Sequence, residues 1–298
     1  MRLGSVGGPR SLSLRTNRTS LMLCLRMKSG FWKRARMGFQ RSGERATTKS
    51  SERWWNKVCR WAGFGTAIIW THGSRMHLEI LVEDQSGKAF LDNAVPRLIA
   101  DEHTFRVHAY KGIGRIPRNL SRVGDASKRI LLDQLPRLLR GYGAAFANYP
   151  ASYPASVIVV CDLDDEGLDE FCAELMAVLN ACTPRPHAFF CLAIEEGEAW
   201  LLGDFPAIKR AYPNARDAVL RTYVNDSICG TWERLADAVF PGGAHALSQE
   251  GWYTVGAEKS RWANNISPHM DFDANSSPSF CRFRDTVRAL CAPLENPA

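Results

Sequence analysis

An unbroken apolar segment that runs straight into acidic residues constrains this chain more than any other feature. The segment "VIVVC" covers residues 157–161, and Asp162, Asp164, Asp165 and Glu166 follow it. A strand without alternation of polar and apolar residues is typical of a parallel sheet that is buried on both faces. Carboxylates gathered at the end of such a strand repel one another and raise each other's pKa unless a cation lies between them. The segment therefore predicts a central parallel strand that ends at an acidic site.

From Met76 onward, strand-like and helix-like segments alternate. We expect strands in "HLEILVE", "TFRVHAY", "VIVVCD" and "HAFFCLAIEE", with helices between them and Ser86 as the N-cap of the first helix. After about residue 205 the pattern indicates short helices that pack around the sheet. Strands separated by helices indicate right-handed βαβ units. The predicted fold class is α/β, with a parallel sheet flanked by helices and a helical C-terminal extension.

Charge is distributed unevenly along the chain. Residues 1–75 hold sixteen Lys and Arg residues but only two acids, so the 38 basic and 31 acidic residues of the whole chain leave 22 and 29 for residues 76–298. We therefore divide the chain into a basic, disordered tail at 1–75 and an α/β domain at 76–298. Three interpretations of the tail stay open: a start codon assigned upstream of Met76, an arm that binds nucleic acid, and a targeting peptide.

Cysteine usage and hydropathy indicate a cytoplasmic protein. The nine cysteines are irregularly spaced and form no Cys-x-x-Cys pair, which argues for reduced thiols and against a structural zinc site. No apolar run approaches the roughly 20 residues that a membrane-spanning helix needs. We therefore expect no membrane among the partners of this protein.

Acidic residues follow three of the four predicted strands. Glu83 and Asp84 follow the first, Asp162 and Asp164 the third, and Glu195, Glu196 and Glu198 the fourth. Functional groups in open parallel sheets collect at the carboxyl ends of the strands, so we expect these side chains to converge. An all-oxygen site selects Mg²⁺, Mn²⁺ or Ca²⁺ over zinc. The alternative for each acid is a role in capping the following helix.

A basic loop lies between the second predicted strand and the next helix. It carries Lys111, Arg115, Arg118 and Arg122, and two glycines in "KGIGRIP" would let backbone amides approach a phosphate. We interpret these four residues as candidate nucleic-acid contacts; a solvated loop is the alternative.

Several motifs, in this order, resemble a Toprim domain: "LVEDQSGKAFL", "VVCDLDD", "IEEGEAWLLGD", "EKSRWANNI" and "SPSF". The likeness is to small stand-alone Toprim-like proteins of the domain of unknown function 4276 type, which are related to the Toprim domains of OLD-family nucleases. It covers about residues 76–285. The resemblance implies a Toprim-like Rossmannoid fold, a Mg²⁺ or Mn²⁺ cofactor and phosphodiester chemistry.

The resemblance also implies roles for individual residues. Glu83 matches the Toprim glutamate, a general acid/base or metal ligand, and Asp162 and Asp164 match the metal-binding pair. Glu198, or Glu195 in its place, matches the extra acid of nuclease-type sites, and Lys259 matches a lysine that stabilises the reacting phosphate. One departure is Asp84, which stands where the family has glycine and adds a carboxylate near the substrate path.

The resulting hypothesis is a metal-dependent nuclease. Because such proteins are often encoded beside ATPases in anti-phage loci, the resemblance implies a partner ATPase of the AAA or ABC type and a nucleic-acid substrate, with DNA favoured over RNA. Two alternatives stay open. One is a phosphatase of the haloacid dehalogenase type, in which Asp162 would attack phosphorus, and the other is a non-catalytic subunit that docks an ATPase through its acidic face.

Overall fold

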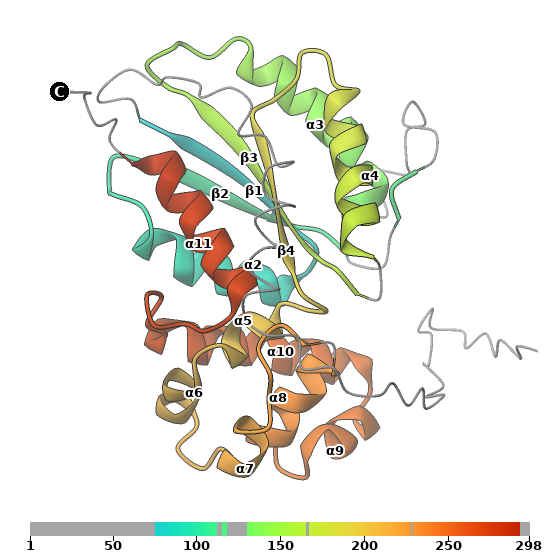
Figure 1. Ribbon diagram of the computed structural model, residues 1–298, viewed down its shortest axis with the longest axis vertical. Coiled ribbons are helices and arrows are strands. Elements are labelled where there is room, and N and C mark those ends of the chain that lie inside the picture. The colour runs from blue at the N-terminus through green and yellow to red at the C-terminus, as the bar shows by residue number, and fades with distance from the viewer. Residues whose placement is uncertain (1–74, 112–114, 118–129, 165–166, 228, 293–298) are drawn as a thin grey trace, which may run out of the picture. The chain divides into compact units, whose positions relative to one another are not determined.

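Four parallel strands form the centre of the computed structural model, which describes residues 75–111, 115–117, 130–164, 167–227 and 229–292 (Figure 1). The strands are β1 (His77–Val82), β2 (Thr104–Ala109), β3 (Ala155–Asp162) and β4 (Ala188–Ala193). They are ordered β2-β1-β3-β4, so β1 and β3 are the inner strands. All four predicted strands and the α/β class are confirmed, while the predicted tail lies outside the described residues.

Both faces of the sheet are buried, which explains why its strands read as continuous apolar runs. Successive residues of β3 belong to different cores: Ile158 and Val160 pack on one side, and Val157 and Val159 pack on the other. Such burial of alternate residues on opposite faces follows from the two-residue repeat of a strand. One core is covered by α2 and α11, and the other by α3 and α4.

The described helices fall into two groups. The helices that cover the faces are α2 (Gln85–Ala94), α3 (Leu131–Phe146), α4 (Leu168–Asn180) and α11 (Pro278–Cys291). The others are α5 (Glu198–Leu202), α6 (Phe205–Ala211), α7 (Asp217–Leu220), α8 (Thr231–Val239), α9 (Gly243–Gln249) and α10 (Trp252–Ile266), with 3₁₀ turns at Val95–Arg97 and Ser267–His269. No helix in the described ranges is long and apolar enough to cross a membrane.

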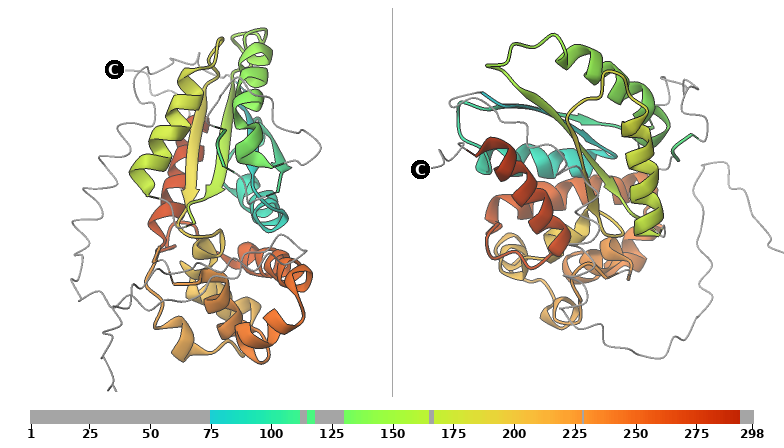
Figure 2. Two further views of the ribbon diagram at one scale, coloured as in Figure 1. Left: turned by 90° about the vertical axis from the view of Figure 1, so that its right-hand side faces the viewer. Right: turned by 45° about the horizontal axis from the view of Figure 1, so that its top comes forward.

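Helices α5 to α10 gather where the strands end, as Figure 2 shows in gold and orange. They share one hydrophobic core with β1 and α2, and residues such as Leu235 of α8 and Trp262 of α10 belong to it. This packing agrees with the expectation that the late helices surround the sheet. The acidic carboxyl ends of the strands are therefore enclosed between the sheet and a layer of helices.

The N-cap of α2 is Asp84 and not Ser86, so that prediction was wrong. The Asp84 carboxylate accepts hydrogen bonds from the Gly87 backbone nitrogen at 2.6 Å and from the Ser86 hydroxyl at 2.7 Å. Aspartate and serine are about equally favoured as N-caps, so residue preference alone does not decide between Asp84 and Ser86. The helix begins two residues earlier than a Ser86 cap would place it, so the cap is the carboxylate directly after Glu83.

An ionisable cluster that the sequence did not suggest lies on the α3 face of the sheet. The buried Glu79 carboxylate accepts hydrogen bonds from Nε2 of His77 at 3.0 Å and Nε2 of His108 at 2.6 Å. The other ring nitrogen of His77 lies 2.7 Å from the Thr104 hydroxyl. Burial raises the pKa of Glu79, but the bonds from the two histidines outweigh burial and lower that pKa below its ordinary value. The cluster fastens β2 to β1 through side chains.

Candidate acidic active site

The register of the sheet brings the acidic strand ends close together. Val82 of β1 pairs with Val160 of β3, so Glu83 follows at nearly the level of Asp162 on the neighbouring strand. Asp162 in turn pairs with Ala193 of β4, three residues before the loop that carries Glu196. Since neighbouring strands are about 4.8 Å apart, side chains from these ends reach a common space.

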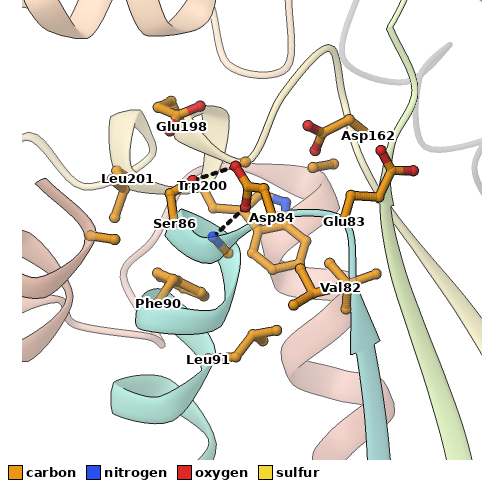
Figure 3. Close-up of a pocket in the computed structure, with 15 residues that line it drawn as sticks. Val82, Glu83, Asp84, Ser86, Phe90, Leu91, Asp162, Glu198, Trp200 and Leu201 are labelled. Carbon is orange, nitrogen blue, oxygen red and sulfur yellow. Dashed lines mark hydrogen bonds between the residues drawn. The ribbon is translucent and has the colours of Figure 1, made fainter. Parts of the chain in front are cut away.

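A narrow cavity occupies this space, with four carboxylates in its wall. Its volume is about 30 Å³, and Glu83, Asp84, Asp162 and Glu198 line it together with apolar side chains such as Trp200. Figure 3 shows Asp84 between Glu198 on one side and the Glu83 and Asp162 carboxylates on the other. The structure therefore brings together four of the acids that were expected to converge, including Asp84, to which the resemblance gave no role in binding a metal.

Glu83 and Asp162 are both held in the cavity under unfavourable electrostatics. The Oε1 atom of Glu83 is buried and has no hydrogen-bond partner among the described residues. Burial, with the nearby charges of Asp164 and Asp84, raises the pKa of Glu83 to about 8. Burial and the charge of Glu83 also raise the pKa of Asp162 well above its ordinary value. Both pKa values are raised for the reason that the sequence suggested: the carboxylates lie close to one another and are shielded from water.

A partly buried lysine lies beside Glu198, one of the carboxylates that line the cavity. Nζ of Lys259 in α10 is 3.0 Å from Oε2 of Glu198 and 3.8 Å from Oε2 of Glu196. Although burial acts in the opposite direction, these carboxylates raise the pKa of Lys259 well above its ordinary value. Burial raises the pKa of Glu198 to about 7 in spite of the lysine beside it. Lys259 is therefore a fixed positive charge at the edge of an acidic cavity.

Glu195 is committed to a different task. Its carboxylate accepts hydrogen bonds from the backbone nitrogens of Cys229, Gly230 and Thr231 at 2.9–3.1 Å, where α8 begins. The backbone of Glu195 is left-handed, with φ of 65°, and the side chain does not line the cavity. Of the two acids that the sequence offered for this position, Glu198 faces the cavity and Glu195 anchors a helix.

The remaining predicted site residues that the structure describes do not line the cavity. Asp164 is exposed and adopts φ of 51°, and it acts on the cavity through its charge on Glu83. Lys111 and Arg115 are exposed and do not line the cavity. Arg118 and Arg122 lie outside the described residues, so the basic loop as a whole stays a prediction.

The donor chemistry of the cavity fits a hard divalent cation. As the side chains stand, no three His, Cys, Asp or Glu residues in the described ranges form a set that could hold a metal ion. The lining acids offer only carboxylate oxygens, which suit Mg²⁺ or Mn²⁺. The unpartnered Oε1 of Glu83 is a buried acceptor that such an ion, or its bound water, would satisfy. Among the lining residues, Glu83, Asp162 and Glu198 are the candidate ligands, and their carboxylates would have to move closer together than they stand to share one ion.

Comparisons of the chain with protein-family models, with curated proteins and with solved structures find no match. The geometry of the cavity is therefore the basis on which a function can be argued.

Proposed function

We propose that this acidic cavity is the centre of a Mg²⁺- or Mn²⁺-dependent hydrolase that cleaves phosphodiester bonds in nucleic acid. One observation carries the proposal: carboxylates that follow three strands line one cavity with a buried, unpartnered oxygen at Glu83 and a partly buried Lys259 beside Glu198. Uncompensated carboxylates are costly in a fold, so their retention favours a site that works with a cation. The Toprim-like motif order agrees with this interpretation.

The side chains divide the work between them. A bound divalent cation would neutralise charge on the phosphate and lower the pKa of an attacking water. Asp84, fixed by its bonds to α2, holds the Glu83 segment in place. Glu83 holds or accepts a proton inside the cavity, and Lys259 keeps Glu198 oriented while offering positive charge to a phosphate oxygen.

The size of the cavity favours a polymeric substrate. A volume of about 30 Å³ has room for an ion or one to two waters, whereas pockets that enclose small-molecule ligands are about 300–1,000 Å³. A phosphodiester bond can reach the mouth of the cavity while the rest of the polymer stays outside. We therefore favour nucleic acid, DNA before RNA, over the small phosphomonoester of the phosphatase alternative, and we retain a partner ATPase as a proposal.

A nicking assay tests this function directly. We expect the full-length protein to nick supercoiled plasmid with Mn²⁺ or Mg²⁺ but not with EDTA, and Asp162→Asn to remove the activity. Asp169→Asn is the matched control, because Asp169 is exposed in the first turn of α4. Nicking by a clean Asp162→Asn preparation would refute the site. Turnover of a small phosphomonoester with a trapped aspartyl phosphate would instead support the phosphatase, and an inactive protein that binds an ATPase would support the subunit role.

A further inference from the structure

Two large aromatic side chains are exposed side by side at the start of α10. Trp252 is 58% exposed and Tyr253 is 79% exposed, and their rings contact edge to face with centroids 6.1 Å apart. Among the described residues, the only other large hydrophobic side chains with such exposure are Tyr149 and Val224. Such a pair of adjacent exposed aromatic side chains is therefore unusual among the described residues.

The helix itself links this pair to the acidic cavity. The inward side of α10 carries Ile266 and Trp262 in the core, then Lys259 beside Glu198. Trp252 precedes Lys259 by seven residues, which is almost two full turns, so both lie on the same side of the helix about 10 Å apart along its axis. Trp252 thus lies on the same side of α10 as the residues that face the cavity, at the end of the helix where that side is exposed to solvent.

We propose that Trp252 and Tyr253 form a platform on which unpaired bases of a single-stranded nucleic acid stack as the strand enters the acidic cavity. This inference rests on the proposed function and specifies its substrate. Stacking suits the location because aromatic faces attract bases without any positive charge. Bases in a duplex already stack on one another, so the platform selects single strands or frayed ends. The net acidic charge of residues 76–298 makes this uncharged contact important, because phosphates alone are repelled.

Binding measurements can separate this role from catalysis. Full-length protein carrying Asp162→Asn is titrated in EDTA against a short fluorescein-labelled oligothymidylate and against a duplex of equal length, and anisotropy is read across a salt series. The salt series is needed because the basic charge of residues 1–75 would also attract phosphate, and such an electrostatic contribution falls steeply with salt. Trp252→Ala, Trp252→Leu, Trp252→Phe and Tyr253→Ala are compared. Tyr149→Ala is the control, since Tyr149 is an exposed aromatic beside Tyr153, near the amino ends of the strands.

We expect Trp252→Ala and Trp252→Leu to weaken single-strand binding by roughly tenfold at every salt concentration, Tyr253→Ala to weaken it less, and Trp252→Phe and Tyr149→Ala to change it little. Equal binding by Trp252→Leu and the parent protein would overturn the platform. So would self-association of the protein that Trp252→Ala abolishes, because the pair would then be an interface between two copies. A protein that never nicks plasmid but binds single strands through Trp252 would refute the proposed function and keep this inference. A protein that nicks plasmid but binds single strands normally after Trp252→Ala would keep the proposed function and refute this inference.

Discussion

Replacing Glu83 with glutamine should change how the stability of the protein depends on pH. The pKa of Glu83 is raised from 4.5 to about 8 in the folded protein. A raised carboxyl pKa means that the folded state holds a proton that the unfolded state has released, so folding loses free energy as pH rises above 4.5. Between pH 4.5 and pH 7 the loss is about 3 kcal/mol, taken from the two pKa values at about 1.4 kcal/mol for each pH unit.

Urea unfolding of the full-length protein in EDTA, at several pH values between about 4.5 and 8, measures this effect. Between pH 4.5 and pH 7 the free energy of unfolding should fall by about 3 kcal/mol more in the wild type than in Glu83→Gln, because glutamine has no proton to release. Glu250→Gln is the control, since Glu250 is exposed at the end of α9. Added Mn²⁺ should remove most of the difference by stabilising ionised Glu83. Parallel pH curves for the wild type and Glu83→Gln in EDTA would refute the reasoning.

Three further perturbations test other contacts. Lys259→Met should cost about 3–5 kcal/mol because it leaves Glu198 buried without a cation, and Glu198→Gln in the same chain should restore part of that loss in a double-mutant cycle. Glu195→Gln should lower the free energy of unfolding by about 2 kcal/mol, since it weakens the bonds from the three backbone amides that lead into α8, and an unchanged urea midpoint would contradict that anchor. Glu79 has a lowered pKa, so its stabilisation is present above about pH 4.5 and is lost as the pH falls; Glu79→Gln should flatten the acid side of the stability curve, and an equally steep acid loss in both proteins would refute this.

The sheet could be predicted from the sequence because each strand is a local signal. The strands that end at Val82, Asp162 and Ala193 can each be recognised from their own apolar residues, without knowing which strands they pair with. Parallel strands place their carboxyl ends at one edge of the sheet. The convergence of Glu83 and Asp162 on one cavity follows from those two facts. The Toprim motif order supplied candidate roles, which the geometry accommodates but which stay proposals.

Contacts between distant segments could not be predicted in the same way. Glu195 and Glu198 look equivalent in "EEGEAW", and only the amides of residues 229–231, more than thirty positions later, assign Glu195 to α8. The pairing of Glu79 with His108 likewise depends on strand register, because the two residues lie on different strands, 29 positions apart in the chain. Lys259 was assigned from the resemblance alone, and an exposed lysine was the simpler expectation.

The left-handed turn at Glu195 makes the acidic cavity mechanically dependent on the helical layer. Glu195, whose carboxylate binds the amides at the start of α8, is three positions before Glu198 in the cavity wall. The backbone between them spans at most about 11 Å. A displacement of α8 therefore pulls on the same short connector that sets the position of Glu198, and Glu198 in turn holds Lys259 of α10. A movement of α8 would therefore change the distances between the charged groups of the cavity. The segment from Glu195 to Glu198 couples the position of α8 to the acidic side chains of the cavity.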